Sequence, residues 1–201
     1  QENCDAAARE RLLQCMHACV DVRGQSGDPT EVAIKNYASF HMKDFCCTRT
    51  AEEPFTSERR MMTVSVLADG RPYSFSKGAP DRLLGRCAYM LEGGGVRPIT
   101  RADRERIAAE NDDMSGRALR VLAFAFAEGG LKEEGLIYLG LCGMSDGLKQ
   151  GVTEAVAECV RAGITPVMIT GDHAKTALAV ARQAGIAERE EQVMTGEEID
   201  R

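Results

Sequence analysis

Apolar and polar residues follow two different spacings along this chain of 201 residues. Between residues 3 and 22 the apolar positions recur every three or four residues, which predicts an amphipathic helix. Residues 62–67 instead alternate at period two, and residues 71–76 do the same after an Asp69-Gly70 pair. Two alternating runs separated by Asp-Gly predict an antiparallel hairpin.

The same patterns predict the remaining elements. Asp28 before Pro29 is a natural helix start, and Thr100 with Asp103 forms a weak capping box. Gly163 and Gly185 stand where helices end. Residues 43–54 show no period, and Gly93 to Gly95 form a loop tip. Helices are expected over 29–42, 81–87, 100–115, 151–162 and 174–184, and strands over 121–126, 136–142 and 164–169.

The character of the chain changes after Gly143, where strands and helices alternate. Such a βαβα order predicts a right-handed crossover and a parallel sheet. We therefore expect an α/β fold class with two domains. Residues 1–141 form an α+β domain with an antiparallel sheet, and residues 142–201 form a Rossmann-type parallel piece, truncated because a doubly wound sheet needs more strands.

Composition narrows the function. The net charge is −6 and the pI about 5.2, so no basic field attracts a nucleic acid and any nucleotide must be held by local cations. No apolar run reaches the ~18 residues that span a bilayer, and the polar start resembles no signal peptide. The eight cysteines include no CxxC pair and are expected to be reduced thiols. His41 with Cys46 and Cys47 is a weak metal candidate, and we expect no metal.

Five places carry candidate chemistry, each with an ordinary structural alternative. Thr170-Gly171-Asp172 follows an apolar run and precedes a helix, where backbone N–H groups favour an anion, although Asp172 could simply be an N-cap. Lys77 before Gly78 could reach an anionic ligand or could be a surface lysine before a turn. An aromatic residue such as Phe55 could stack on a base or belong to the core. Glu31 could simply stabilise the first turn of a helix through the helix dipole. Arg120 could simply be a solvated residue at the end of a strand.

Together these motifs resemble a known family. The elements are Gly27-Asp28-Pro29-Thr30-Glu31, Ser76-Lys77-Gly78-Ala79-Pro80-Asp81, Arg117 to Ala123, and Met168-Ile169-Thr170-Gly171-Asp172. In that order they are similar to the cytoplasmic ATP-handling part of P-type cation pumps, closest to the calcium-transporting branch. The resemblance extends from about Cys4 to the end of the chain.

The resemblance implies roles for particular residues. Lys77 and Gly78 would line the ATP pocket, Phe55 would stack on adenine, and Glu31 would face the nucleotide. Arg60 and Arg120 would reach phosphates. Thr170, Gly171 and Asp172 would belong to a haloacid-dehalogenase-like phosphorylation domain, where the threonine holds a phosphoryl oxygen and the aspartate faces the ribose or the phosphate–magnesium region.

The chain also departs from the pump pattern. Ser57 stands where calcium pumps place an arginine, and Asp146-Gly147-Leu148-Lys149 replaces Asp-Pro-Pro-Arg, so that only charge is kept at Lys149. The Asp-Lys-Thr-Gly-Thr element that becomes phosphorylated and the Gly-Asp-Gly-x-Asn-Asp element that binds magnesium do not occur. We therefore expect no catalytic residue and no metal ligand here, and binding without turnover. A free phosphatase is excluded because a nucleophilic Asp-x-Asp is missing.

The sequence thus predicts an ATP-binding cytoplasmic fragment of an ion-translocating ATP hydrolase of the P type, with calcium as the ion that the resemblance suggests. Its expected partners are ATP, with Mg²⁺ carried by the nucleotide, and the remaining phosphorylation, actuator and transmembrane domains of a parent chain. It would lie at the cytoplasmic face of a membrane. The alternative is a stand-alone nucleotide-sensing module without catalysis.

Overall fold

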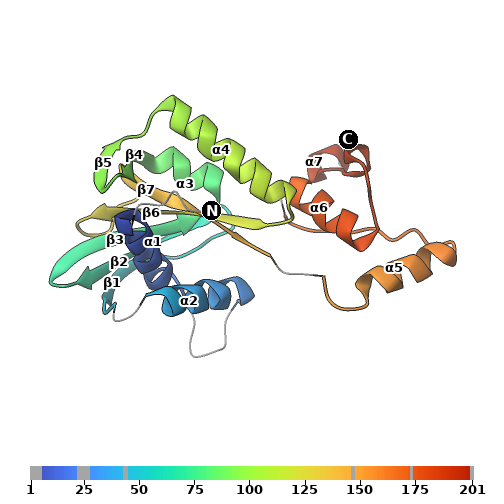
Figure 1. The fold of residues 1–201 in the computed structure, drawn as a ribbon, viewed down its shortest axis with the longest axis horizontal. Helices are drawn as coiled ribbons and strands as arrows, with labels where there is room; N and C mark the ends of the chain where they lie inside the picture. The colour runs from blue at the N-terminus through green and yellow to red at the C-terminus, as the bar shows by residue number, and fades with distance from the viewer. Residues whose placement is uncertain (1–5, 22–27, 43–44, 146–147, 173, 200–201) are drawn as a thin grey trace. The chain divides into compact units, whose positions relative to one another are not determined.

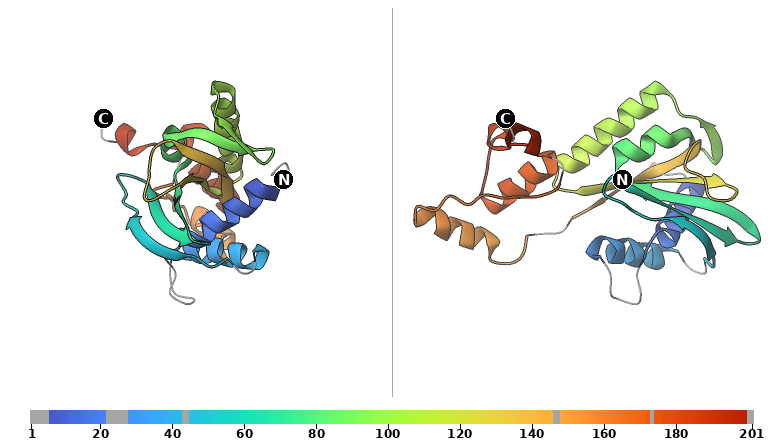
Figure 2. Two further views of the ribbon diagram at one scale, coloured as in Figure 1. Left: turned by 90° about the vertical axis from the view of Figure 1, so that its left-hand side faces the viewer. Right: turned by 180° about the vertical axis from the view of Figure 1, so that it is seen from behind.

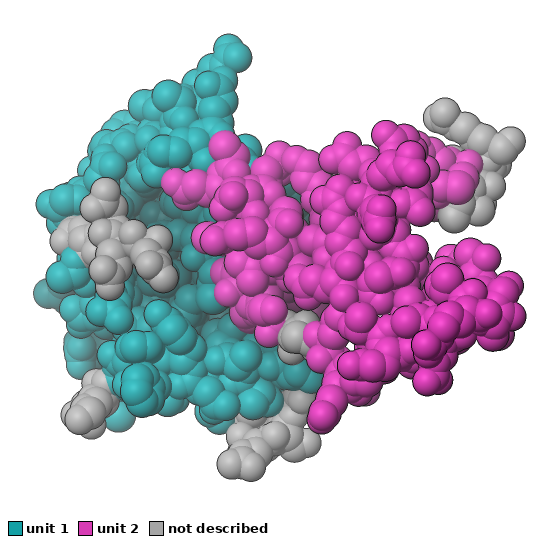
Figure 3. Space-filling view, turned by 45° about the vertical axis from the view of Figure 1, so that its right-hand side comes forward, with its two compact units in different colours: residues 1–108, 122–142 teal, residues 109–121, 143–201 magenta. Residues whose placement is uncertain are grey.

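The computed structural model describes residues 6–21, 28–42, 45–145, 148–172 and 174–199 (Figure 1). Cys4, the loop up to Gly27, Asp146 and His173 lie outside the described residues. The chain divides into two compact units, residues 1–108 with 122–142 and residues 109–121 with 143–201 (Figure 3). The positions of the two units relative to one another are not determined.

Helices and strands follow one another as mixed α/β elements. In chain order they are α1 Ala6–Ala18, α2 Pro29–His41, β1 Thr48–Glu53, β2 Met61–Ala68, β3 Arg71–Gly78, α3 Pro80–Arg86, β4 Cys87–Glu92, β5 Gly95–Pro98, α4 Arg101–Gly116, β6 Arg120–Glu128, β7 Leu136–Met144, α5 Val152–Arg161, α6 Ala174–Ala184, the 3₁₀ turn η1 Glu190–Gln192, and α7 Gly196–Ile199. None of the described helices is both long and apolar enough to cross a bilayer.

Seven strands form one mostly antiparallel sheet in the order β1-β2-β3-β6-β7-β4-β5. The parallel exception is the pair of β4 with β7. This arrangement confirms the mixed α/β fold class. The sequence pattern missed β1, which lies at the sheet edge and is almost wholly exposed. An exposed edge strand needs no apolar alternation, so it leaves no periodic signal. The strands β4 and β5 on either side of the Gly93–Gly95 loop tip were missed as well.

The predicted hairpin is confirmed as β2 and β3. Asp69 and Gly70 have φ values of 49° and 73°, so both occupy the left-handed region that a two-residue hairpin turn requires. The turn places Ala68 opposite Arg71 and carries the register along the strands to the pair of Met61 with Gly78. The turn chemistry therefore fixes which residues of the two strands face each other.

Helices cover both faces of the central strands, as the ribbon shows from several sides (Figures 1 and 2). On one face Ala125 packs with Leu83 of α3 and Ile107 of α4. On the other, α1 places the guanidinium of Arg11 5.1 Å from the ring centre of Phe126. Because both faces are covered, serine and threonine side chains on β2 and β3 are buried and need hydrogen-bond partners.

Two predicted helix starts are confirmed in detail. The side chain of Asp28 accepts a hydrogen bond from the Thr30 amide at 2.9 Å at the start of α2. At α4, Asp103 accepts from the Thr100 amide at 2.9 Å, and the Thr100 hydroxyl accepts from the Asp103 amide at 3.2 Å. The Arg97 guanidinium also pairs with Asp103 at 2.7 Å. Together these contacts hold the pKa of the Asp103 carboxyl well below its usual range.

The second unit is helical over most of its described residues. The helix ends at Gly163 and Gly185 are confirmed, because both glycines have a φ of 77°. At the first of them the Ile164 amide donates to the Cys159 carbonyl at 2.9 Å, which satisfies a free carbonyl of the helix end.

The strand predicted over residues 164–169 is not formed. No strand occurs in residues 148–172 or 174–199, and Val167 and Ile169 are 78% and 94% exposed. A strand is defined by hydrogen bonds to a neighbouring strand, and within the described part of the chain nothing pairs with this segment. The apolar pattern is present, but no strand among the described residues pairs with this segment, and Val167 and Ile169 stay exposed.

Candidate functional site

A buried ion pair stands at the end of the hairpin. Lys77, near the end of β3, is only 4% exposed, and its ammonium pairs with a carboxylate oxygen of Glu31 in the first turn of α2. The other oxygen of Glu31 accepts from the Asp21 amide at 3.2 Å. A buried ammonium is costly without a partner, so this pairing explains how the sheet tolerates a lysine at this position.

Gly78 follows directly and is required by backbone packing. A Cβ atom at this position would lie 2.5 Å from the Met61 Cβ and 2.7 Å from the Arg60 carbonyl oxygen. The backbone at the start of β2 thus approaches Gly78 so closely that packing alone requires a glycine at this position. Arg60 itself has a φ of 53°, its carbonyl accepts from the Ala79 amide at 2.9 Å, and its guanidinium pairs with Asp81 in α3.

Phe55 is not a core residue. It lies in the loop 54–60 between β1 and β2, and the residue is 57% exposed. A ring this exposed makes little contribution to packing, so the core alternative does not fit. The face of an aromatic ring left open to solvent can stack on a base.

The structure brings one group of predicted residues together and leaves another apart. Because Met61 pairs with Gly78, the loop that carries Phe55 and Arg60 enters the sheet at the end where Lys77 meets Glu31. The remaining predicted residues belong to the second unit: Arg120, Thr170, Gly171 and Asp172. Their positions relative to the Lys77 end are not determined.

Within the second unit the Thr-Gly-Asp turn is a local structure. The Thr170 hydroxyl donates to a carboxylate oxygen of Asp172 at 3.0 Å and accepts from the Asp172 amide at 3.1 Å. Both side chains lie on the surface. The departures Ser57 and Lys149 are exposed as well.

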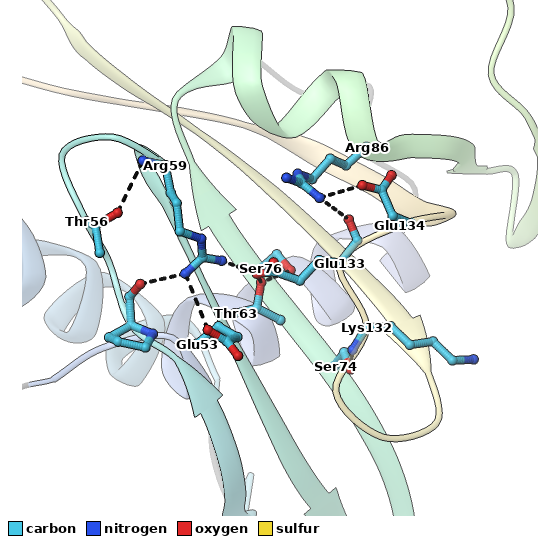
Figure 4. Close-up of polar contacts among 11 residues, drawn as sticks. Glu53, Thr56, Arg59, Thr63, Ser74, Ser76, Arg86, Lys132, Glu133 and Glu134 are labelled. Atoms are coloured by element: carbon cyan, nitrogen blue, oxygen red, sulfur yellow. Dashed lines mark hydrogen bonds and ion pairs between the residues drawn. The ribbon is translucent and has the colours of Figure 1, made fainter.

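A polar cluster that the sequence pattern did not predict joins the hairpin to the loops 54–60 and 129–135. Glu133 pairs with Arg59 and accepts a hydrogen bond from Thr63, and Thr63 in turn is hydrogen-bonded to Ser76 (Figure 4). One signal was available. Counting outwards from the Asp69-Gly70 turn pairs Thr63 with Ser76, two polar side chains on the same face of a hairpin.

The described cysteines form no disulfide with one another. The seven described cysteines are free thiols, and no group of three His, Cys, Asp or Glu side chains among the described residues is placed to hold a metal ion. Burial raises the pKa of the Cys87 thiol to about 12, so it stays protonated and unreactive at neutral pH. A shallow cavity of about 330 Å³ lies at the opposite end of β3 from Lys77, lined by Arg71, Pro72, Tyr73, Glu128 and Gly129.

Comparison with known proteins relates most of the chain to one family. Residues 14–151 match the family described as the P-type ATPase cytoplasmic domain N. The chain is 41% identical over 203 residues to calcium-transporting ATPase 1 of Bacillus cereus, covering 95% of this chain and 23% of that protein. It is 37% identical over 212 residues to calcium-transporting ATPase 1 of Lactococcus lactis, covering 96% and 24%.

A plant relative shows the same relationship. Calcium-transporting ATPase 1, plasma membrane-type, of Oryza sativa is 37% identical over 197 residues, covering 88% of this chain and 19% of that protein. The chain therefore spans about a quarter or less of the length of the curated relatives it matches. It belongs to the family of P-type ATPase cytoplasmic N domains, because the family match covers more than half of it.

Proposed function

We propose that this chain is the ATP-binding cytoplasmic portion of a calcium-type P-type ATPase and that it presents ATP for formation of an aspartyl-phosphate. The observation that carries the proposal is the end of the β2–β3 hairpin. There a buried, carboxylate-paired Lys77 and an exposed Phe55 on the adjoining loop offer a cation for phosphates and a ring for adenine. The relatives, named as calcium-transporting ATPases, support the choice of ion.

In this proposal residues 1–141 are the nucleotide-binding domain and residues 142–201 are part of the phosphorylation domain. Lys77, Gly78, Glu31, Phe55 and Arg60 would contact the nucleotide, with Mg²⁺ accompanying its phosphates. Glu31 would hold the Lys77 ammonium in place while no nucleotide is bound, because the two side chains already form an ion pair.

Four more residues complete the proposed machinery. Arg120 would reach the phosphates, and Thr170, Gly171 and Asp172 would act in the phosphorylation domain. The exposed apolar residues Val167 and Ile169 support this assignment, because they would be buried by neighbouring strands of a parallel sheet. The partners would be the other domains of a parent chain at the cytoplasmic face of a membrane.

The test is an ATP titration of the 201-residue chain followed by NMR. We expect amides near Phe55, Lys77 and Gly78 to shift with a Kd of about 0.1–1 mM, since local cations must act within an acidic protein. Lys77→Met should abolish the shifts near Gly78. The matched control Lys132→Met removes an exposed lysine of the β6–β7 loop and should change nothing.

Two results would contradict the proposal. If the amide signals of Phe55 and Lys77 do not shift at millimolar ATP, the proposed nucleotide site is wrong. Sustained release of phosphate by the pure chain would show that it holds a nucleophile that the proposal places elsewhere.

A further inference from the structure

Glu133 stands at the centre of a polar cluster on the sheet, here called the Glu133 cluster: Arg59, Thr63, Ser76 and Glu133. The Thr63 hydroxyl donates to the Glu133 carboxylate at 2.7 Å, and the Arg59 guanidinium pairs with the same oxygen. Since Thr63 has a single proton to donate, the Ser76 hydroxyl, 2.9 Å away, donates to Thr63. Thr63 and Ser76 are fully buried, so the groups that hold the carboxylate belong to the interior of the sheet.

The loop that carries Glu133 is itself attached to the sheet. This β6–β7 loop, residues 129–135, is clamped by buried Ser74, whose hydroxyl donates to the Gly130 carbonyl at 2.6 Å and accepts from the Lys132 amide at 2.9 Å. Glu133 comes directly after this clamp (Figure 4). Its position is therefore set by the sheet.

Arg59 links Glu133 to the loop that carries Phe55. Its guanidinium donates to the Pro54 carbonyl at 2.7 Å, immediately before Phe55, while its backbone amide donates to the Thr56 hydroxyl oxygen at 3.2 Å. One guanidinium thus joins Glu133 to the backbone on the N-terminal side of Phe55. The Arg59 and Glu133 side chains are 25% and 22% exposed, so water screens this pair less than a surface pair.

The cluster and the Lys77 pair occupy opposite faces of the sheet. Neighbouring residues of a strand point to opposite faces, so the side chain of Ser76 points away from that of Lys77. Ser76 pairs across the sheet with Ala125, which packs against α3 and α4, whereas Lys77 reaches α2. The Glu133 cluster can therefore act on the Phe55 loop without touching the lysine.

We propose that Glu133 is a positioning residue for nucleotide binding, which holds the Phe55 loop in place through Arg59 from the face of the sheet opposite Lys77. The inference rests on the proposed function, because Phe55 is there the adenine-stacking residue. A loop fixed before the ligand arrives loses less conformational entropy on binding. Glu133 should consequently strengthen binding of the base and leave binding of the phosphates unchanged.

The experiment compares AMP, ADP and ATP as probes on wild type and Glu133→Ala. We expect the affinity to fall by the same factor for all three nucleotides, about five- to tenfold, because part of the base stacking is lost. Glu133→Gln keeps the size of the side chain and an oxygen acceptor, so its affinity should lie between those of wild type and Glu133→Ala. It replaces Glu133→Ala in the comparison if that variant folds poorly. The matched control Glu134→Ala removes the neighbouring carboxylate, 75% exposed and paired with Arg86, and should match wild type.

A double-variant cycle tests the path through Arg59. If Glu133 acts through that guanidinium, Arg59→Ala with Glu133→Ala should bind no more weakly than the weaker single variant. Additive losses would overturn the path. A loss that grows from AMP to ATP, or an unchanged affinity with only a lowered melting temperature, would overturn the positioning role.

A readout without nucleotide separates this inference from the proposed function. Hydrogen exchange at the Arg60 amide, which donates to the Thr56 carbonyl at 2.8 Å, should accelerate in Glu133→Ala while the amides of α4 stay unchanged. If wild type binds no nucleotide but this exchange accelerates, the proposed function fails and the coupling of Glu133 to the loop stands. If wild type binds nucleotide and exchange and affinity are both unchanged, the inference alone fails.

Discussion

The end of the β2–β3 hairpin and the segment of residues 164–170 depart in opposite ways from the usual rule that apolar residues are buried and polar residues are exposed. At the hairpin the polar side chains of Thr63, Ser76 and Lys77 are buried. In the other segment the apolar side chains of Val167 and Ile169 are exposed.

The difference lies in the neighbours. The hairpin is flanked by β1 and β6 and covered by helices on both faces, so each buried polar group has a partner. The segment after Gly163 has no paired strand among the described residues. Burial is thus a property of the assembled surroundings, and a residue's own polarity predicts it only when those surroundings are present.

Gly78→Ala should have the largest effect, because it attacks the hairpin end directly. The added Cβ would overlap Met61 and the Arg60 backbone at 2.5–2.7 Å, and backbone cannot move aside cheaply. We expect a loss of about 3 kcal/mol in the free energy of unfolding, measured by urea denaturation. Gly85→Ala is the control, since nothing lies within 4 Å of a Cβ there. Equal stability of the two variants would contradict the close approach.

The same substitution in both regions sharpens the comparison. Val64→Ala in β2 removes two fully buried methyl groups and should cost about 2–3 kcal/mol of unfolding free energy. Val167→Ala removes the same groups from a residue that is mostly exposed and should cost less than about 0.5 kcal/mol. Urea denaturation of both variants gives the ratio. A comparable cost at Val167 would mean that the segment is buried in solution.

Phe55→Ala tests whether an exposed ring serves binding and not folding. We expect a loss of ~1–3 kcal/mol in ATP binding and almost no change in melting temperature. Phe40→Ala removes the other strongly exposed phenylalanine, on α2, and should leave ATP binding as it is. Calorimetric titration and thermal unfolding on the same samples separate the two effects. A large loss of stability with unchanged affinity would return Phe55 to the core.

The smallest effect concerns pH and the Asp103 cap of α4. The Arg97 guanidinium lowers the pKa of Asp103 in the folded state, while the unfolded value stays near 3.8. The unfolded state therefore takes up the proton first as pH falls, so this contribution to stability is complete above about pH 5 and is lost progressively below it. Asp103→Asn should flatten the fall of the melting temperature in acid. An identical acid slope in the variant would assign that fall to other carboxyl groups.

Local chemistry in the sequence was enough for several features. The Asp69-Gly70 turn, the Asp28 and Thr100–Asp103 caps and the glycines at 163 and 185 act through their own backbone and nearest neighbours, and all are confirmed. The motif order also predicted the family that the comparison shows. Each of these signals depends on contacts within a few residues, or on a string that can be read directly.

Tertiary structure decided the rest. It paired Lys77 with Glu31 across 46 positions and joined Arg59 to Glu133 across 74, separations at which no periodicity in the sequence indicates a contact. It placed the polar strand β1 at an edge, and in the part of the chain that the structure describes no strand pairs with the apolar run at 164–169. The physical reason is common to these cases: a strand, a buried charge and a positioned loop are each stabilised by partners that other parts of the chain must supply.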